Sequence, residues 1–561
     1  MQLFWSELLV VVVLVWLWRG CVLVRLPFRT VLKCEIGTAE GKPQVEQYGL
    51  DELVASADAV LAGLGPLAAG LAGLAGQACG AVTLDAMEVL VTGQGRELLR
   101  GVVQLGLDTQ AAAEVRVREV TGADGVRRGR AEPGHARPVV TMLGEVSVRR
   151  IAYRSGIREA GSLFPRDAVL DLPPCGYSWE LQRLAEMFCL CGSYEQAHEF
   201  VLAVTGVSVG RRQLQQITAA AAADAERFYQ DPARPRDEPV LPGAGPGGSL
   251  PPLVISADGK GVAMRPEARR RYYGKKAQRA QTFGKRLGTG EKKGHKRIAE
   301  TACVFDVIAP GRPRTPEQVM GPAPGSAANA PRAVNRWYAC DITASCDVTI
   351  GKGLDEAARR DPGHQRTWLF LADGDRHQIA SFQAGAAERD ITPVILIDFV
   401  HVLEYLWKAA WCFHAPRDPA AEDWVTAQGL DILHGRAAEV ISRIRQLAAC
   451  HPPRPGSEHA KIIHATLSYL ENKQPWMDYP AALAAGWPIA TGVIEGACRH
   501  LVQDRMGITG ARWGLDGAQA ILWLRALHAS GDHSAYWDYH IGQERQRNHL
   551  SRFKDGLGLA A

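Results

Sequence analysis

The spacing of hydrophobic and polar residues changes several times along the chain, and each change predicts a different kind of element. Leu, Ala and Val recur at helical intervals over residues 46–118, with Asp, Glu and Arg between them, which predicts helices. Thr83 is a candidate cap for the more regular part of this region. Residues 121–138 are rich in Gly, Arg and Pro, which predicts a loop or linker. Apolar and polar residues then alternate over 139–153, as they do in a β-hairpin.

Helical spacing returns over residues 179–223, where a short glycine-bounded turn at 206–210 separates two segments. This is the outline of a helix-turn-helix, whose second helix would present Arg and Gln to base edges in DNA. Many purely structural helical hairpins share the outline, so that alternative stays open. The candidate DNA-reading residues are Arg211, Arg212, Gln213, Gln215 and Gln216.

Three apolar runs, each predicted to be a strand, lead into acidic residues. Residues 253–255 precede Asp258, residues 367–372 precede Asp373, and residues 391–397 precede Asp398. Two adjacent parallel strands would bring their terminal carboxylates within a few ångströms of each other. Further strands are expected at 298–309 and 336–343.

A fourth acid is predicted to lie on a helix near the C-terminal end of the chain. Thr491 can cap that helix, which places Glu495 in its first turn, with Arg499 and Val502 on the same face. Each acid alone is more often structural than catalytic. The joint placement of Asp258, Asp373 and Glu495 is what indicates a site.

Three converging carboxylates cannot all ionise cheaply without cations. Two Mg²⁺ ions about 3.5–4 Å apart would neutralise them and clamp the attacking and leaving oxygens of a phosphodiester. Mg²⁺ suits this role because it takes oxygen ligands and keeps water molecules, and Mn²⁺ is the expected substitute. Asp258, Asp373 and Glu495 are therefore the candidate catalytic residues and metal ligands, and Asp375 competes with Asp373 for the second position.

Positive charge is concentrated in one segment, residues 265–297. Thirteen Lys or Arg against two Glu give this segment a charge of +11, compared with +4 for the whole chain, and three aromatic residues are interspersed. Such a segment beside acids indicates a polyanionic substrate, although a solvated basic loop is the alternative. The candidate DNA contacts here are Arg269, Arg270, Arg271, Lys275, Lys276, Lys285 and Arg286.

Bulk properties set further bounds. A chain of 561 residues should form two to four domains, and 47% hydrophobic residues are ordinary for a globular protein. Twelve cysteines without a Cys-x-x-Cys pair indicate reduced thiols in the cytoplasm rather than a zinc ribbon. The apolar stretch 8–18 is only eleven residues long, whereas a membrane-spanning helix needs about 20. It also lacks the features of a signal peptide, so we expect a translation start assigned too early, with a membrane anchor as the alternative.

Several motifs together make the chain resemble a known family. The chain is similar to bacterial insertion-sequence transposases of the DDE type, specifically the ISKra-four family, which are similar in turn to the Mutator-like group. The resemblance spans roughly residues 140–540, is most specific in the C-terminal half, and leaves the first 45 residues unmatched. The segments that carry it are 144–154, 254–265, 314–317, 396–410, 490–502, 504–506 and 512–513.

The resemblance implies an α/β chain with an RNase H-like catalytic domain at 251–545, interrupted by a helical insertion at about 402–487. In front of it would lie an apolar segment at 1–45, a helical region at 46–135, a DNA-binding region with the β-hairpin and the helix-turn-helix at 136–230, and a linker at 231–250. The triad would be Asp258, Asp373 and Glu495, although the chain reads Leu-Ala-Asp-Gly-Asp at 371–375 where the family usually has Leu-Asp-Gly. Accessory candidates are Asp375, Asp398 and His401 of an Asp-x-x-His signature, and Arg499.

Two roles are open for that signature: it orients DNA near the cut, or it only holds the helical insertion in place. The implied activity is metal-dependent cleavage at the element ends, followed by transfer of the 3′-hydroxyl to target DNA. The implied partners are double-stranded DNA and further copies of the chain on it, in the bacterial cytoplasm at the nucleoid, with no stable membrane partner. Two alternatives remain: a catalytically inactive DNA-binding protein derived from such an element, and an RNase H-like nuclease or resolvase.

Overall fold

The computed structural model describes residues 50–75, 83–157, 159–232, 234, 250–269, 296–310, 312–321, 330–508 and 510–554. The chain divides into two compact units. One comprises Met1–Ser178 with Thr205–Val207 and Arg545–Ala561, and the other comprises Trp179–Val204 with Ser208–Glu544. Among the described residues, no helix is long and apolar enough to cross a membrane. The apolar N-terminal segment lies outside these residues, as does nearly all of the linker expected at 231–250.

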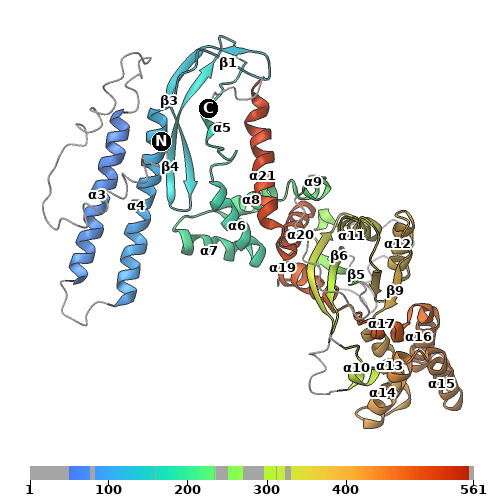
Figure 1. Ribbon diagram of the computed structural model, residues 1–561. Helices are drawn as coiled ribbons and strands as arrows, with labels where there is room; N and C mark the ends of the chain where they lie inside the picture. The colour runs from blue at the N-terminus through green and yellow to red at the C-terminus, as the bar shows by residue number, and fades with distance from the viewer. Residues whose placement is uncertain are drawn as a thin grey trace, which may run out of the picture. The chain divides into compact units, whose positions relative to one another are not determined.

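The described part of the first unit begins with helices, as the sequence predicted. Helices α3 (Leu50–Ala75) and α4 (Leu84–Ala112) pack side by side (Figure 1). Thr83 caps α4, because its hydroxyl accepts a hydrogen bond from the Ala86 N–H at 3.2 Å. The side-chain amide of Gln104 in α4 makes the two hydrogen bonds that a neighbouring strand would make with the backbone of Ser147. It accepts from the Ser147 N–H at 2.8 Å and donates to the Ser147 carbonyl at 3.0 Å.

The β-hairpin predicted at 139–153 is present but is longer than expected. Strand β3 (Arg130–Thr141) pairs antiparallel with β4 (Gly144–Arg154), and the short strands β1 (Val120–Thr121) and β2 (Arg127–Arg128) pair with each other. The prediction of a loop over 121–138 was therefore wrong for most of its length. The strand accommodates its irregular composition through a register shift between Glu132 and His135, with Gly134 between them at a φ of +80°. The short helix α5 (Pro165–Val169) follows.

The second unit starts with the helices predicted at 179–223. They are α6 (Trp179–Cys191), α7 (Tyr194–Thr205) and α8 (Arg211–Ala221), followed by α9 (Ala225–Gln230). Most of α7 and all of α6 and α8 belong to the unit that contains the large sheet, whereas the β-hairpin belongs to the first unit. The sequence had assigned the hairpin and these helices to one region.

A five-stranded mixed sheet forms the centre of the second unit (Figure 1). The strand order is β7-β6-β5-β8-β9; β5 is antiparallel to β6, β6 is antiparallel to β7, and β5, β8 and β9 run parallel. This confirms an α/β fold. The strands are β5 (Leu253–Ala263), β6 (Lys296–Ile308), β7 (Arg332–Asp341), β8 (Trp368–Ala372) and β9 (Val394–Ile397).

Helices cover both faces of this sheet. Helix α11 (Cys346–Arg360) packs on the face that carries Ile255 and Ala302, and its Gly353 lies against these two side chains. Asp258 is three positions beyond Ile255, and because side chains alternate along a strand it points to the opposite face. Helices α12 (Arg376–Ala387) and α10 (Pro316–Met320) complete this part of the chain, the latter capped by Thr315 in a capping box.

A run of helices follows β9, in the region where the resemblance implies a helical insertion. It contains α13 (Phe399–Phe413), α14 (Pro419–Leu433), α15 (Ala437–Cys450), α16 (Glu458–Lys473) and α17 (Tyr479–Ala484). The chain then returns to the sheet through α18 (Gly492–Ala497), a π-helical segment (Cys498–Gln503) and α19 (Asp504–Met506). Helices α20 (Leu515–Ser530) and α21 (His533–Asn548) follow, and then a 3-10 helix (Leu550–Arg552).

Candidate active site

Asp258 and Asp373 come from adjacent strands at the same edge of the parallel pairing. The sequence predicted that Asp258 ends its strand, and this was wrong. Asp258 lies in the middle of β5 opposite Thr301, because the antiparallel partner β6 continues alongside. The parallel pairing with β8, however, stops at Ser256. Asp258 therefore lies just beyond the part of the sheet that β8 covers, and Asp373 directly follows the last residue of β8.

The environment of Asp373 disfavours its negative charge. Burial raises the pKa of this carboxyl above its ordinary value, and the charges of Asp258 and Asp375 add to that effect. A hydrogen bond from the Asp375 N–H, at 2.7 Å, and the nearby His401 act in the opposite direction without cancelling it. A carboxyl group with this combination of burial and like charge is stabilised by a cation.

The two candidates for the second acid differ in what their carboxylates do. Asp375 is the N-cap of α12, and its Oδ1 accepts hydrogen bonds from the backbone N–H groups of His377 at 2.8 Å and Gln378 at 3.0 Å. A helix cap of this kind accounts for the residue structurally. Asp373 has no such role in starting a helix, which favours it as the site residue.

Asp398 connects the start of the insertion to the segment that carries Glu495. It is fully buried and caps α13 by accepting from the Val400 N–H at 2.6 Å. Its other oxygen accepts from the Thr491 N–H at 3.1 Å and from the Thr491 hydroxyl. Thr491 does stand at the N-cap position of α18, but its side chain makes no capping bond because it binds Asp398 instead.

His401 completes this network. Its Nδ1 lies 3.2 Å from Asp398 Oδ2, and this hydrogen bond raises the pKa of His401 from 6.5 to about 9. Burial works to raise the pKa of Asp398, but the bonds from His401 and Thr491 outweigh it and the pKa is lowered. At neutral pH the pair is therefore an imidazolium and a carboxylate, and the positive charge of His401 lies close enough to Asp373 to act on it.

Glu495 is exposed on α18 and lies near this pair. Its Oε1 is 3.1 Å from the Thr491 hydroxyl, and one ligand atom each from Asp398, His401 and Glu495 lie within 4.8 Å of one another. Among the described residues, Asp258, Asp373 and Glu495 do not form such a group of three. Glu495 therefore lies close to Asp398 and His401, and Asp373 interacts electrostatically with Asp258 and His401.

The helix of Glu495 lies over the central strand on the face of Asp258. Cys498, three residues after Glu495, is buried against Asp258 and Thr301, and burial followed by the Asp258 carboxylate raises the pKa of its thiol. At Cys498 the helix widens into the π-helical segment, which shifts the register of the residues that follow. Arg499 is exposed but Val502 is fully buried, so the prediction that both share the face of Glu495 holds only for Arg499.

Two residues beside Asp373 were not identified from the sequence. The Tyr469 hydroxyl of α16 donates to the Asp373 carbonyl at 2.9 Å, and its ring stacks on Tyr405 with centroids 3.9 Å apart. Lys473, one turn later, is 4% exposed, and its ammonium has no hydrogen-bond partner within the described part of the chain. Burial lowers the pKa of Lys473, and Arg376 adds to this, while Asp375 and Asp373 oppose it.

The predicted helix-turn-helix residues are on the surface. Arg211, Arg212, Gln213, Gln215 and Gln216 are all exposed on α8, and Arg211 pairs with Glu195 of α7 at 2.5 Å. Of the predicted DNA contacts in the basic segment, only Arg269 is described, and it is half-buried. The other candidates there lie outside the described residues: Arg270, Arg271, Lys275, Lys276, Lys285 and Arg286.

Comparison with known protein families gives no match for this chain, and no curated protein matches it either.

Proposed function

We propose that the protein is a DDE-type transposase that cuts and joins DNA with the help of divalent metal ions. The observation that supports the proposal is that Asp258 and Asp373 lie at neighbouring positions of adjacent strands, with the helix of Glu495 packed over the same face of the sheet. Asp258 and Asp373 come from adjacent parallel strands, and Glu495 comes from a helix packed over the same face. The strand order β7-β6-β5-β8-β9, three antiparallel strands continued by two parallel ones, is compatible with an RNase H-like fold.

The donor set fits magnesium. The side chains of Asp258, Asp373 and Glu495 offer only carboxylate oxygens, which are the ligands that Mg²⁺ prefers. The raised pKa of Asp373, caused by burial and then by Asp258 and Asp375, is relieved when a cation is present. Bound Mg²⁺ would supply activation of a nucleophilic water and stabilisation of the leaving oxygen.

The remaining residues position this site and bind the substrate. Asp398 holds Thr491, and thereby fixes the start of the helix that carries Glu495. His401 is protonated at neutral pH and places a positive charge beside Asp373, where it attracts a phosphate group of DNA. The Arg and Gln side chains exposed on α8 are proposed to read the element ends.

The test separates catalysis from DNA binding. Asp258→Asn, Asp373→Asn and Glu495→Gln keep the shape of each side chain and remove its charge. Each change should lower cleavage of DNA that carries the element ends by roughly 100-fold or more, while binding to the same DNA is kept. Inverted repeats in the DNA that flanks the gene would supply these ends.

Asp375→Asn is the matched control, because it removes an equal charge two residues from Asp373 and asparagine is also a good helix cap. It should leave cleavage close to that of the unchanged protein. If Asp375→Asn loses cleavage and Asp373→Asn keeps it, the second metal ligand is Asp375 rather than Asp373, and the proposed mechanism is unchanged. Normal cleavage by Glu495→Gln would refute the proposal, and binding without any cleavage by the unchanged protein would favour a catalytically inactive DNA-binding protein.

A further inference from the structure

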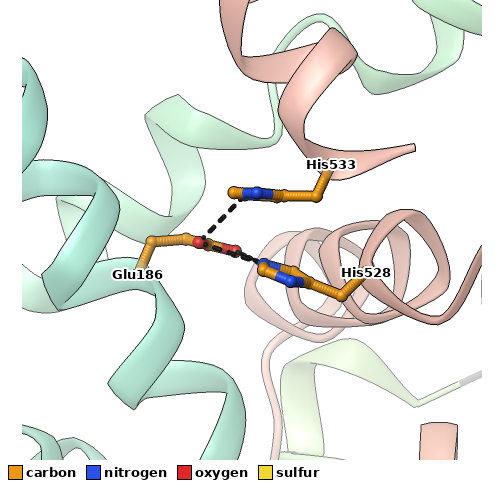
Figure 2. Close-up of side chains that lie close together, drawn as sticks. All are labelled: Glu186, His528 and His533. Carbon is orange, nitrogen blue, oxygen red and sulfur yellow. Dashed lines mark hydrogen bonds and ion pairs between the residues drawn. The ribbon is translucent and has the colours of Figure 1, made fainter. Parts of the chain in front are cut away.

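A second group of metal-ligating side chains lies away from the acids of the proposed active site. Glu186 from the middle of α6, His528 from the last turn of α20 and His533 from the first residue of α21 point toward one another (Figure 2). One ligand atom from each lies within 4.8 Å of the others. All three residues belong to the same compact unit.

The local fold brings the two histidines together. α20 ends at Gly531, which adopts the left-handed conformation with a φ of +79°, and α21 begins two residues later. This tight turn stacks the imidazole rings of His528 and His533 with centroids 3.6 Å apart and an interplanar angle of 21°.

Glu186 is buried beneath these rings and is incompletely satisfied. Its side chain is 0% exposed, and within the described part of the chain neither Glu186 Oε1 nor His533 Nε2 has a hydrogen-bond partner, although both atoms are buried. A buried carboxylate oxygen and a buried imidazole nitrogen that face each other without hydrogen bonds are candidate ligands for a cation.

The distances fit a metal better than they fit hydrogen bonds. His528 Nε2 lies 3.3 Å from Glu186 Oε1 and 3.4 Å from Oε2, and His533 Nε2 lies 3.2 Å from Oε2. Charge-assisted hydrogen bonds between such groups are usually about 2.7–2.9 Å long. Ligand atoms around a tetrahedral zinc ion, with bonds of about 2.0–2.2 Å, are about 3.3–3.6 Å apart.

We propose that Glu186, His528 and His533 bind one Zn²⁺ ion, with water as the fourth ligand on the partly exposed side of His528. Two imidazole nitrogens and one carboxylate oxygen suit zinc and are a poor set for Mg²⁺, which prefers oxygen alone. The ion fastens α6 to the turn between α20 and α21. Since α6 and α20 both pack against α8, and α20 also packs against β7, the ion fixes the α6–α8 helices on the sheet. This inference does not depend on the proposed function.

The metal content of the purified full-length protein tests the inference. After dialysis against zinc-free buffer containing Mg²⁺, elemental analysis should find one zinc per chain. Chelation should remove it and lower the thermal unfolding midpoint, and Zn²⁺, but not Mg²⁺, should restore that midpoint. Cobalt in place of zinc should give the visible absorption bands of a tetrahedral site with nitrogen and oxygen ligands.

The variants assign the ion to these residues. Glu186→Gln keeps the shape of the side chain and should lose the zinc with unchanged near-ultraviolet circular dichroism, and His533→Ala should lose it as well. Glu495→Gln should retain the zinc, which excludes the group formed by Asp398, His401 and Glu495. His464→Ala, which removes an exposed imidazole from α16, is the control for loss of a histidine. Absence of zinc from the unchanged protein, or equal retention by Glu186→Gln and His533→Ala, would overturn the inference.

Discussion

The hydrogen bond between His401 and Asp398 makes the stability of the sheet-containing unit depend on pH in a specific direction. The folded protein holds the pKa of His401 at about 9, compared with 6.5 for a free histidine. A group whose pKa is raised on folding contributes stability that is fully present below about 6.5 and is lost as the pH rises through about 9. Replacing His401 with Gln removes this contribution and keeps a side chain of similar length.

The size of the effect follows from the same shift. A rise from 6.5 to about 9 corresponds to about 3 kcal/mol if none of it is screened. The imidazole is 29% exposed, so screening by water reduces the expected contribution to roughly 1–2 kcal/mol. The difference in unfolding free energy between the unchanged protein and His401→Gln should therefore shrink by roughly 1–2 kcal/mol between about pH 6 and about pH 10.

Urea unfolding followed by tryptophan fluorescence measures this difference. Eleven of the fourteen tryptophans lie in the unit made of Trp179–Val204 and Ser208–Glu544, so the signal reports mainly on the unit that contains His401. His464→Gln, at an exposed position of α16, should show no pH-dependent difference and is the control. If the difference in unfolding free energy between the original protein and His401→Gln is the same at both pH values, the raised pKa cannot be assigned to the bond with Asp398.

Three further predictions concern the core and the predicted DNA-reading helix. Phe382→Ala should lower the unfolding free energy by about 3–5 kcal/mol, because the ring is fully buried and stacked on a second phenylalanine 4.0 Å away; a loss below about 1 kcal/mol in urea unfolding would contradict this. Arg366→Met should cost about 3 kcal/mol in the same assay, because it removes a guanidinium 2.5 Å from the fully buried carboxylate of Asp306, and no loss would show that neighbouring groups replace it. Changing Arg211 and Gln215 together to Ala should reduce discrimination between element ends and random DNA by ~1–3 kcal/mol per base contact in competition binding, whereas an equal loss on both DNAs would mean that they contact only phosphate.

Three strands of the sheet could be predicted from the sequence because each contains a short, uninterrupted apolar run. The apolar runs that became β5, β8 and β9 are short and each leads into an acid, so both the strands and the acids were identified. The first part of β3, residues 130–138, was predicted to be a loop because it is rich in Gly, Arg and Pro, and it is extended because it pairs with β4. Tertiary pairing overrides local preference in such segments.

The details of the site were harder to predict than its acids. Thr491 has the residue type and position of a helix cap, and only the folded chain shows that the buried Asp398 takes its hydroxyl. Tyr469 and Lys473 lie in a long helical region, and nothing in their spacing separates them from ordinary surface residues. Their proximity to Asp373 results from the packing of α16, which a single sequence does not encode locally.

The central claim, that acids of this sheet hold metal ions at a phosphate of DNA, is tested most directly by replacing one oxygen of that phosphate with sulfur. Mg²⁺ binds sulfur poorly, whereas Mn²⁺ is less selective for oxygen. Cleavage of an element end that carries a phosphorothioate at the cut should be lost in Mg²⁺ and regained in Mn²⁺, for one of the two sulfur stereoisomers. Equal cleavage of the oxygen and sulfur substrates in Mg²⁺, with both stereoisomers, would contradict the account.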